Sequence, residues 1–244
     1  MKQAFLVFIL TGLSISLMAQ EDSISSASYR HTPSPDFAGA LVVDYGVSFF
    51  DKNSAIMDTE LWKSPTINVY YMYPFKIKSS RFSFNVGAGI GTEKYTFSSP
   101  VTFVDSLNVT LIDTIAYLPF FENISGVKKS QVVTNYFDIP LEFRIHSRKN
   151  DHKRSFVLAL GGKVGFRFAT KAKVVYSEFE VDKKYKSLYH YNVNAVRYGA
   201  SARLGIGPFT IWGYYGLNQF FGGDKISGVN NPKTYSFGIS LATF

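Results

Sequence analysis

The charged side chains that could do chemistry in this chain lie within apolar segments. Acidic and basic residues alternate with apolar ones in FDIPLEFR (137–144), GGKVGFRF (161–168) and VRYGASARLG (196–205). On a β-strand, a spacing of two residues directs them all to one face, opposite the apolar residues. The residues predicted to share this polar face are Asp44, Glu93, Asp138, Glu142, Arg144, Lys163, Arg167, Lys171, Arg197 and Arg203.

This set of charges fits two kinds of chemistry. Buried charges need partners of opposite sign, because their desolvation is otherwise uncompensated. We therefore expect a network of internal salt bridges. The expected carboxylates are Asp138 and Glu142, and the expected partners are Arg167, Arg197 or Arg203. A proton or ion path along the same charges is the alternative function.

Catalytic and metal-binding patterns are weak by comparison. The four histidines, His31, His146, His152 and His190, are scattered over an expected tail, strand end, turn and loop. The sequence has no cysteine and no GxSxG or HExxH motif. We therefore predict no enzyme activity, no cofactor and no metal site. A Ser, His and Asp assembled from separate strands would escape this search, so a hydrolase remains the distant alternative.

The elements that carry the charges are β-strands. Eight segments alternate apolar and polar residues, most over the roughly ten residues that a tilted strand needs to cross a bilayer. A soluble sandwich would also alternate, but here the apolar face is rich in aromatic residues and the other face holds Gly, Ser and single charges. The prediction is an all-β, eight-stranded antiparallel transmembrane β-barrel. Its strands are expected at 37–50, 66–76, 82–97, 136–146, 156–172, 194–206, 209–217 and 235–244.

The connections between these segments alternate between long and short. This pattern is typical of outer-membrane barrels, with short periplasmic turns and long extracellular loops, and it places both termini in the periplasm. The last segment, YSFGISLATF (235–244), would close the barrel against 37–50. With Tyr235, Gly238, Leu241 and the terminal Phe244, it is similar to the C-terminal signal that barrel assembly machinery uses. Phe244 is out of phase with the apolar face, which predicts a bulge or a shifted last residue.

The N-terminus predicts export. Residues 1–19 have a lysine followed by an apolar stretch and a small-residue cleavage site, as in a signal peptide. A flexible periplasmic tail would follow at 20–35, and the barrel would occupy 36–244. Charged residues make up 18% and aromatic residues 17%. The net charge of +8 alone would suit nucleic acid, but the aromatic content and the lack of a recognition motif argue against that partner.

Three features of the loops and strands raise further expectations. The longest loop, 98–135, contains an apolar stretch that we expect to form a hairpin above the barrel or a partner surface, with Leu111, Ile112, Phe120 and Phe121. Basic residues gather at 147–155 and at 173–193, either as solvated charge or to contact a periplasmic partner and lipopolysaccharide phosphates respectively. Pro140 cannot donate to a sheet ladder, so it predicts a local bulge.

The segments YFDIPLEFR, GGKVGFRF, VRYGASARLG and SFGISLATF together resemble the PorT/SprT-type outer-membrane β-barrels of Bacteroidetes. The similarity covers about 136–244 and, with the barrel layout, most of the chain. It implies a non-enzymatic accessory role in type IX secretion of proteases and adhesins, with other secretion components, outer-membrane lipid and the assembly machinery as partners. The alternative is a general surface barrel for envelope integrity, adhesion or lipid contact. The resemblance brings no catalytic residues.

Overall fold

The computed structural model describes residues 39–51, 57–77, 80–106, 109–114, 124–147, 155–179, 181–222, 226–227 and 230–243. The signal peptide and tail predicted at 1–35, and Phe244, lie outside these residues. No helix in the described part of the chain is long and apolar enough to cross a membrane.

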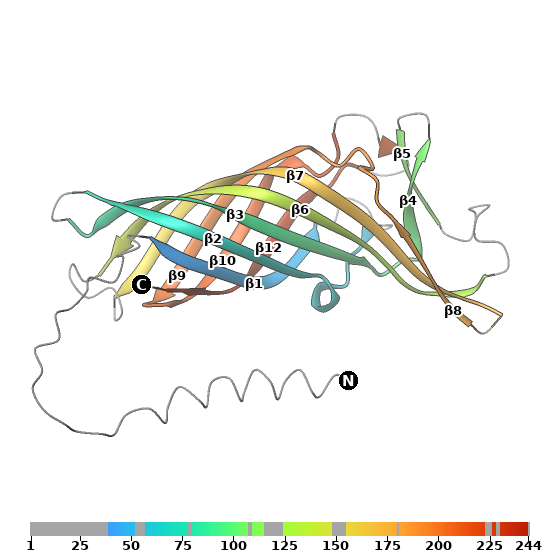
Figure 1. The fold of residues 1–244 in the computed structure, drawn as a ribbon, viewed down its shortest axis with the longest axis horizontal. Helices are drawn as coiled ribbons and strands as arrows, with labels where there is room; N and C mark the ends of the chain where they lie inside the picture. The colour runs from blue at the N-terminus through green and yellow to red at the C-terminus, as the bar shows by residue number, and fades with distance from the viewer. Residues whose placement is uncertain are drawn as a thin grey trace, which may run out of the picture. The chain divides into compact units, whose positions relative to one another are not determined.

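Eight strands close into an antiparallel ring, which confirms the predicted fold (Figure 1). Each strand pairs with the next strand of the ring in chain order, and the last pairs back to the first, from Val42 opposite Ala242 to Phe50 opposite Thr234. Closure leaves the ring itself without an unpaired edge. The eight strands are β1 (Ala40–Phe50), β2 (Pro65–Lys76), β3 (Phe82–Phe97), β6 (Ile124–His146), β7 (Phe156–Glu178), β9 (Val196–Ile206), β10 (Phe209–Gln219) and β12 (Lys233–Ala242).

The alternation of the sequence becomes the two surfaces of the barrel. Large apolar side chains such as Tyr45, Tyr71 and Phe137 are exposed on the outside, where a membrane protein meets lipid. Asp44, Asn68 and other polar residues of the same strands are buried inside. This inversion of the usual soluble pattern carries the charged residues into the interior.

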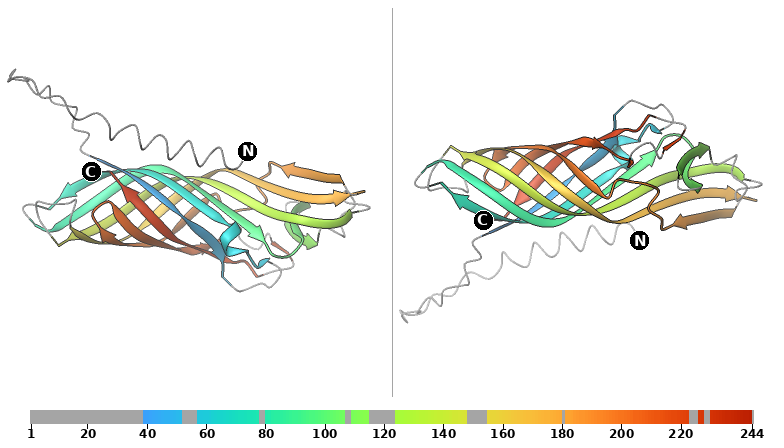
Figure 2. Two further views of the ribbon diagram at one scale, coloured as in Figure 1. Left: turned by 90° about the horizontal axis from the view of Figure 1, so that it is seen from below. Right: turned by 90° about the horizontal axis from the view of Figure 1, so that it is seen from above.

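Two strands are much longer than predicted. β6 and β7 each span 23 residues and remain paired with each other beyond the ring. β8 (Val181–Ser187) pairs with the outer part of β7, so three strands extend past the barrel wall (Figure 2). The predicted loops 98–135 and 173–193 are therefore largely strand in their described parts; Val132, Ala172 and Val174 of this extension are buried, whereas β8 is mostly exposed.

The hairpin predicted within 98–135 is present as β4 (Val101–Ser106) and β5 (Val109–Thr114), which are antiparallel. The short strand β11 (Ile226–Ser227) pairs with β5. A 3₁₀ turn, η3 (Leu61–Lys63), precedes β2. These elements gather at the end of the barrel that bears the long connections.

Bulges occur at positions that differ from the expectation. The register of β3 with β6 is the same on both sides of Pro140, so the predicted bulge there is wrong. The ladder instead has no β3 partner for Ile139 and Pro140, where the missing N–H would have been needed. A bulge does lie in β7, where Asn135 opposes Ala169 and Tyr136 opposes Arg167, leaving Phe168 as the extra residue.

An aromatic cluster fills the long-connection end of the barrel. Phe50 stacks on Tyr95 with 4.2 Å between ring centroids, and Phe220 meets both rings edge-on. Phe103 from β4 packs against Phe97 and so ties the hairpin to this cluster. We call this buried group the aromatic cap; its members are Phe50, Met57, Tyr95, Phe97, Val101, Phe103, Val132, Ala172, Tyr191, Val193, Phe220 and Phe221.

Candidate functional site: a charge network in the barrel lumen

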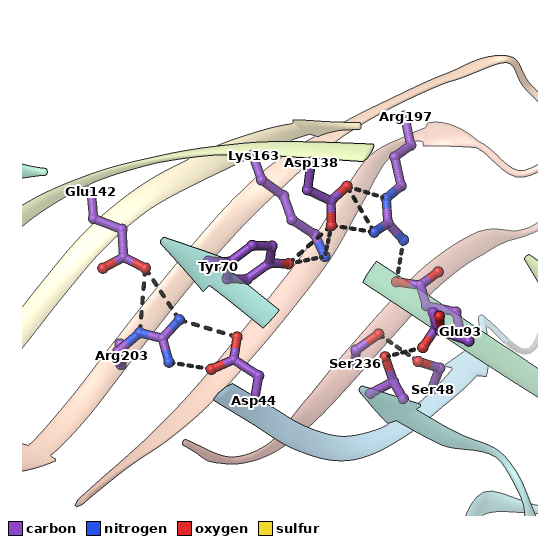
Figure 3. Close-up of polar contacts among 12 residues, drawn as sticks. Asp44, Ser48, Tyr70, Glu93, Asp138, Glu142, Lys163, Arg197, Arg203 and Ser236 are labelled. Carbon is purple, nitrogen blue, oxygen red and sulfur yellow. Dashed lines mark hydrogen bonds and ion pairs between the residues drawn. The ribbon is translucent and has the colours of Figure 1, made fainter. Parts of the chain in front are cut away.

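Below the aromatic cap, charges from four strands meet around Asp138. Arg197 of β9 reaches across to β6, and its Nη2 lies 2.9 Å and 2.7 Å from the two carboxylate oxygens of Asp138. The Nζ of Lys163 lies 3.5 Å from Oδ2 of the same carboxylate. Arg197 also forms an ion pair with Glu93 of β3. These four residues form the first quartet, shown in Figure 3.

Tyrosine side chains complete the first quartet. The hydroxyl of Tyr70 donates to Oδ2 of Asp138 at 2.9 Å, and that of Tyr95 donates to Oε2 of Glu93 at 2.7 Å. The guanidinium carbon of Arg197 lies 3.8 Å from the ring centroid of Tyr136, within the range of a cation–π contact. Each buried carboxylate thus has a neutral donor in addition to a cation, which offsets its loss of hydration.

A second quartet lies nearer the short-turn end. Arg203 of β9 donates two hydrogen bonds to the carboxylate of Asp44 in β1, of 2.6 Å and 3.2 Å. Its Nη2 also lies 3.3 Å from Oε1 of Glu142. The other oxygen of Glu142 accepts from Arg144, with 2.7 Å to Nη2 and 2.8 Å to Nε. Figure 3 shows the bridge from Glu142 through Arg203 to Asp44.

Each quartet holds two cations and two anions, so each is electrically neutral. This balance differs from the expected excess of cations, and two residues explain the difference. Lys171 is exposed on the outer surface, because the bulge at Phe168 reverses the faces of β7 beyond it. Arg167 is half-buried and bonds to the carbonyl of Asn194 at 3.4 Å and to Thr170 at 3.3 Å. The predicted pairing of Arg167 with a lumen carboxylate is therefore corrected.

Two glycines make room for the first quartet. A Cβ on Gly165 would lie 2.2 Å from Oδ1 of Asp138, and one on Gly91 would lie 2.7 Å from Nη2 of Arg197. Any larger residue at either position would displace the side chains of this charge pair from the positions that they occupy. Sequence analysis placed charges and glycines on the inner face, but it did not predict that these glycines and the tyrosines would contact the charge pairs. Their shared parity with the charges was the signal that could have found them.

The remaining predicted residues lie on the barrel wall and above it. In β12, Gly238 opposes Gly46 in close contact, and Tyr235 stacks on Phe49 with 5.3 Å between centroids. Leu241 is exposed on the outer face. The β5 backbone places Ile112 opposite Phe103 and Leu111 opposite Val104 in the hairpin register. Phe120 and Phe121 lie outside the described residues.

The arrangement suits packing rather than turnover. Every charge of the two quartets touches an opposite charge, and the aromatic cap covers one end of the lumen. No group of three His, Cys, Asp or Glu within the described residues is placed to hold a metal ion. An interior of eight strands is just wide enough for side chains to fill it. The lumen is therefore a polar core.

A closed eight-stranded ring with a lipid-facing apolar surface and a filled polar lumen defines the class of small transmembrane β-barrels. Residues 11–222 match the family described as outer membrane protein beta-barrel domain, and the chain belongs to this family. The barrel is accordingly an outer-membrane β-barrel. No curated protein sequence matches the chain.

Solved structures give distant similarities. The chain is similar to the crystal structure of Ail, the attachment invasion locus protein of Yersinia pestis, with 13% identity over 84% of this chain and 97% of that chain and a TM-score of 0.37. A structure of Ail in complex with the heparin analogue sucrose octasulfate gives 12% identity over the same shares and a TM-score of 0.34. A mutant porin of Rhodopseudomonas blastica gives 10% identity over 84% and 99%, with a TM-score of 0.19.

Proposed function

We propose that this outer-membrane barrel is a non-enzymatic accessory component of protein secretion, in the type IX system that its resemblance to PorT-type barrels implies. The observation that carries the proposal is the filled lumen, with two neutral quartets beneath an aromatic cap. Such an interior cannot pass a folded protein, so the barrel is not the conduit. It acts through surfaces that project beyond the membrane.

The proposal includes an orientation. Residues 1–19 act as a removed export signal, both termini lie in the periplasm, and the long connections lie outside. Supporting this, the start of β1 and the end of β12 pair with each other at one end, beside the tight turn at Gly207. The hairpin β4–β5 and the extension of β6, β7 and β8 lie at the opposite end. These two elements are the working surfaces.

A gene deletion with complementation tests the role. The informative variant replaces residues 104–121 with a Gly-Ser segment of the same length, which removes the outer hairpin but keeps Val101 and Phe103 in the aromatic cap. The matched variant neutralises the basic residues of the opposite turn, Arg148, Lys149, Lys153 and Arg154. The expected result is a folded, heat-modifiable barrel in both cases, with loss of extracellular protease only in the hairpin variant.

Three other outcomes are informative. Loss of secretion in the turn variant alone would move the working surface to the periplasm. Loss in both would make the two ends jointly necessary. Normal secretion in both variants and in the full deletion would overturn the secretion role, and the second candidate, a general surface barrel, would replace it. The lysines on the outer surface favour that second candidate as a lipid-contacting barrel, and their arrangement supports a separate inference.

A further inference from the structure

Six lysines share one outer face just above the lipid-facing surface. The last apolar row across the three adjacent strands aligns Ile90, Phe137 and Phe166. In the next row Thr92 opposes Asn135, so across β3 and β6 the apolar surface ends there. We call the set above it the lysine face; it comprises Lys94, Lys129, Lys171, Lys173, Lys184 and Lys186.

The register shows why these side chains lie on one face. Directly opposed residues of an antiparallel pair project to the same side of the sheet. One row aligns Lys94, Val133 and Lys171, and the row above it aligns Gln131, Lys173 and Lys186. The third row aligns Lys129, Val175 and Lys184.

The bulge at Phe168 is what turns this part of β7 outward. Without the extra residue, the alternation that buries Lys163 would also direct Lys171 and Lys173 into the lumen. Phe168 itself is 58% exposed on the lipid-facing surface immediately below the lysines. One residue therefore changes the interior charge balance and creates a cationic exterior.

Among the described residues, no carboxylate forms an ion pair with the lysine face, although Asp182, one row above Lys184 on the same face, is close enough to interact with its charge. The carboxylates described in the β7–β8 hairpin form ion pairs with other lysines: Asp182 pairs with Lys128 at 2.6 Å, and Glu178 pairs with Lys183 at 3.0 Å. Among the described residues, none of the six forms an ion pair. Partial desolvation, followed by the charge of Lys129, lowers the pKa of Lys94. Desolvation and the neighbouring lysine charges likewise lower the pKa of Lys173.

We propose that the lysine face binds the phosphate groups of a phosphorylated glycolipid, lipopolysaccharide, in the outer leaflet. In such a lipid, anionic phosphates of the headgroup lie directly above the acyl chains. On the protein, the lysine face likewise lies directly above the exposed apolar surface. Lysine is a suitable point charge for phosphate, and a desolvated pair at the membrane surface is screened less than one in solution. This inference rests on the orientation in the proposed function, with β8 outside.

The test uses the purified full-length protein in nanodiscs of zwitterionic lipid. Binding is measured for lipid A carrying two phosphates and for the same lipid A after dephosphorylation. The variant K129Q/K173Q/K184Q removes three charges from the centre of the lysine face. The control K63Q/K128Q/K183Q removes three charges whose lysines already have carboxylate partners. Both variants change the net charge by the same amount, so general electrostatic attraction cancels in the comparison.

We expect the native protein and the control to prefer phosphorylated lipid A by about tenfold or more, and the K129Q/K173Q/K184Q variant to lose this preference. Equal binding of the two lipids, or an unchanged preference in that variant, would overturn the proposal. Equal or stronger binding of a soluble sulfated polysaccharide would also overturn it, because the site would then recognise polyanions in general. The measurement needs no secretion, so its failure is separate from failure of the secretion role.

Discussion

The buried charges of this barrel are stable because each sits within a small neutral group. Arg197 is the central residue of the first quartet, since it touches Asp138 and Glu93 and lies over an aromatic ring. Removing it would leave Glu93 with only the hydroxyl donor of Tyr95, and Asp138 with the Tyr70 hydroxyl and a lysine at 3.5 Å. The cost of such a change comes mainly from the charges left behind.

Arg197→Ala should therefore destabilise the barrel by about 3–5 kcal/mol, the typical result of breaking a buried charge pair from one side. Lys63→Ala removes an exposed pair with Glu60 and should change the free energy of unfolding by only about 0–1 kcal/mol. Urea unfolding from liposomes, followed by tyrosine and tryptophan fluorescence, measures both. Equal stability of the two variants would show that the quartet contributes nothing to folding.

At the scale of strands, the sequence predicts well what depends on alternation. The apolar and polar faces of β1, β2, β9 and β12 follow directly from residues two apart, because a closed barrel allows only two environments. Alternation cannot reveal where one residue is inserted, so Lys171 was assigned to the wrong face. It also did not reveal that β6 and β7 continue as strands into the segments predicted as loops, where Val132 and Ala172 are buried in the aromatic cap. The outer parts of β6 and β7 exist because they pair with each other, and that pairing is not encoded in either segment alone.

Similarly, the sequence could place the lumen charges but not their grouping. Asp44 and Arg203 are far apart in the chain, and only the order and tilt of strands bring them together. The division into two quartets depends on which side chains reach across the lumen. Gly165 and Gly91 leave room for the first quartet, because a Cβ at either position would displace its side chains.

Closure of the barrel can be tested where its first and last strands meet. The hydroxyls of Ser48 and Ser236 lie 2.8 Å apart inside the barrel, between β1 and β12 (Figure 3). The chain has no cysteine, so S48C/S236C would contain a single possible disulfide. We expect it to form on oxidation and to change mobility on non-reducing gels, because two side chains this close can meet disulfide geometry.

The matched control is S48C/S240C. Ser240 also faces the lumen on β12, but it opposes Asp44 in the register and lies two inward-facing rows away from Ser236, the partner of Ser48. This control should oxidise far more slowly. Equal oxidation of both variants would mean that β1 and β12 slide or separate.

For the whole molecule, orientation follows from which end carries the long connections. Leu188 lies just after β8 and is 73% exposed, whereas Ser80 lies in the short turn between β2 and β3. Leu188→Cys should react with a membrane-impermeant maleimide on intact cells. Ser80→Cys should react only after the outer membrane is permeabilised. The opposite result would invert the barrel and would remove the basis for placing lipopolysaccharide on the lysine face.

The lumen makes a final prediction about transport. Two barriers lie in series along the barrel: the aromatic cap and the two quartets below it. A filled eight-stranded barrel leaves no continuous water column, so the native protein should give no stepwise conductance in a planar bilayer. The variant F50A/F220A removes two rings of the aromatic cap but leaves every quartet contact in place. It should also give no stepwise conductance. A porin in the same bilayer is the positive control. Conductance in F50A/F220A alone would show that the cap is the only barrier, and that the quartets line a hydrated path along which ions or protons could move.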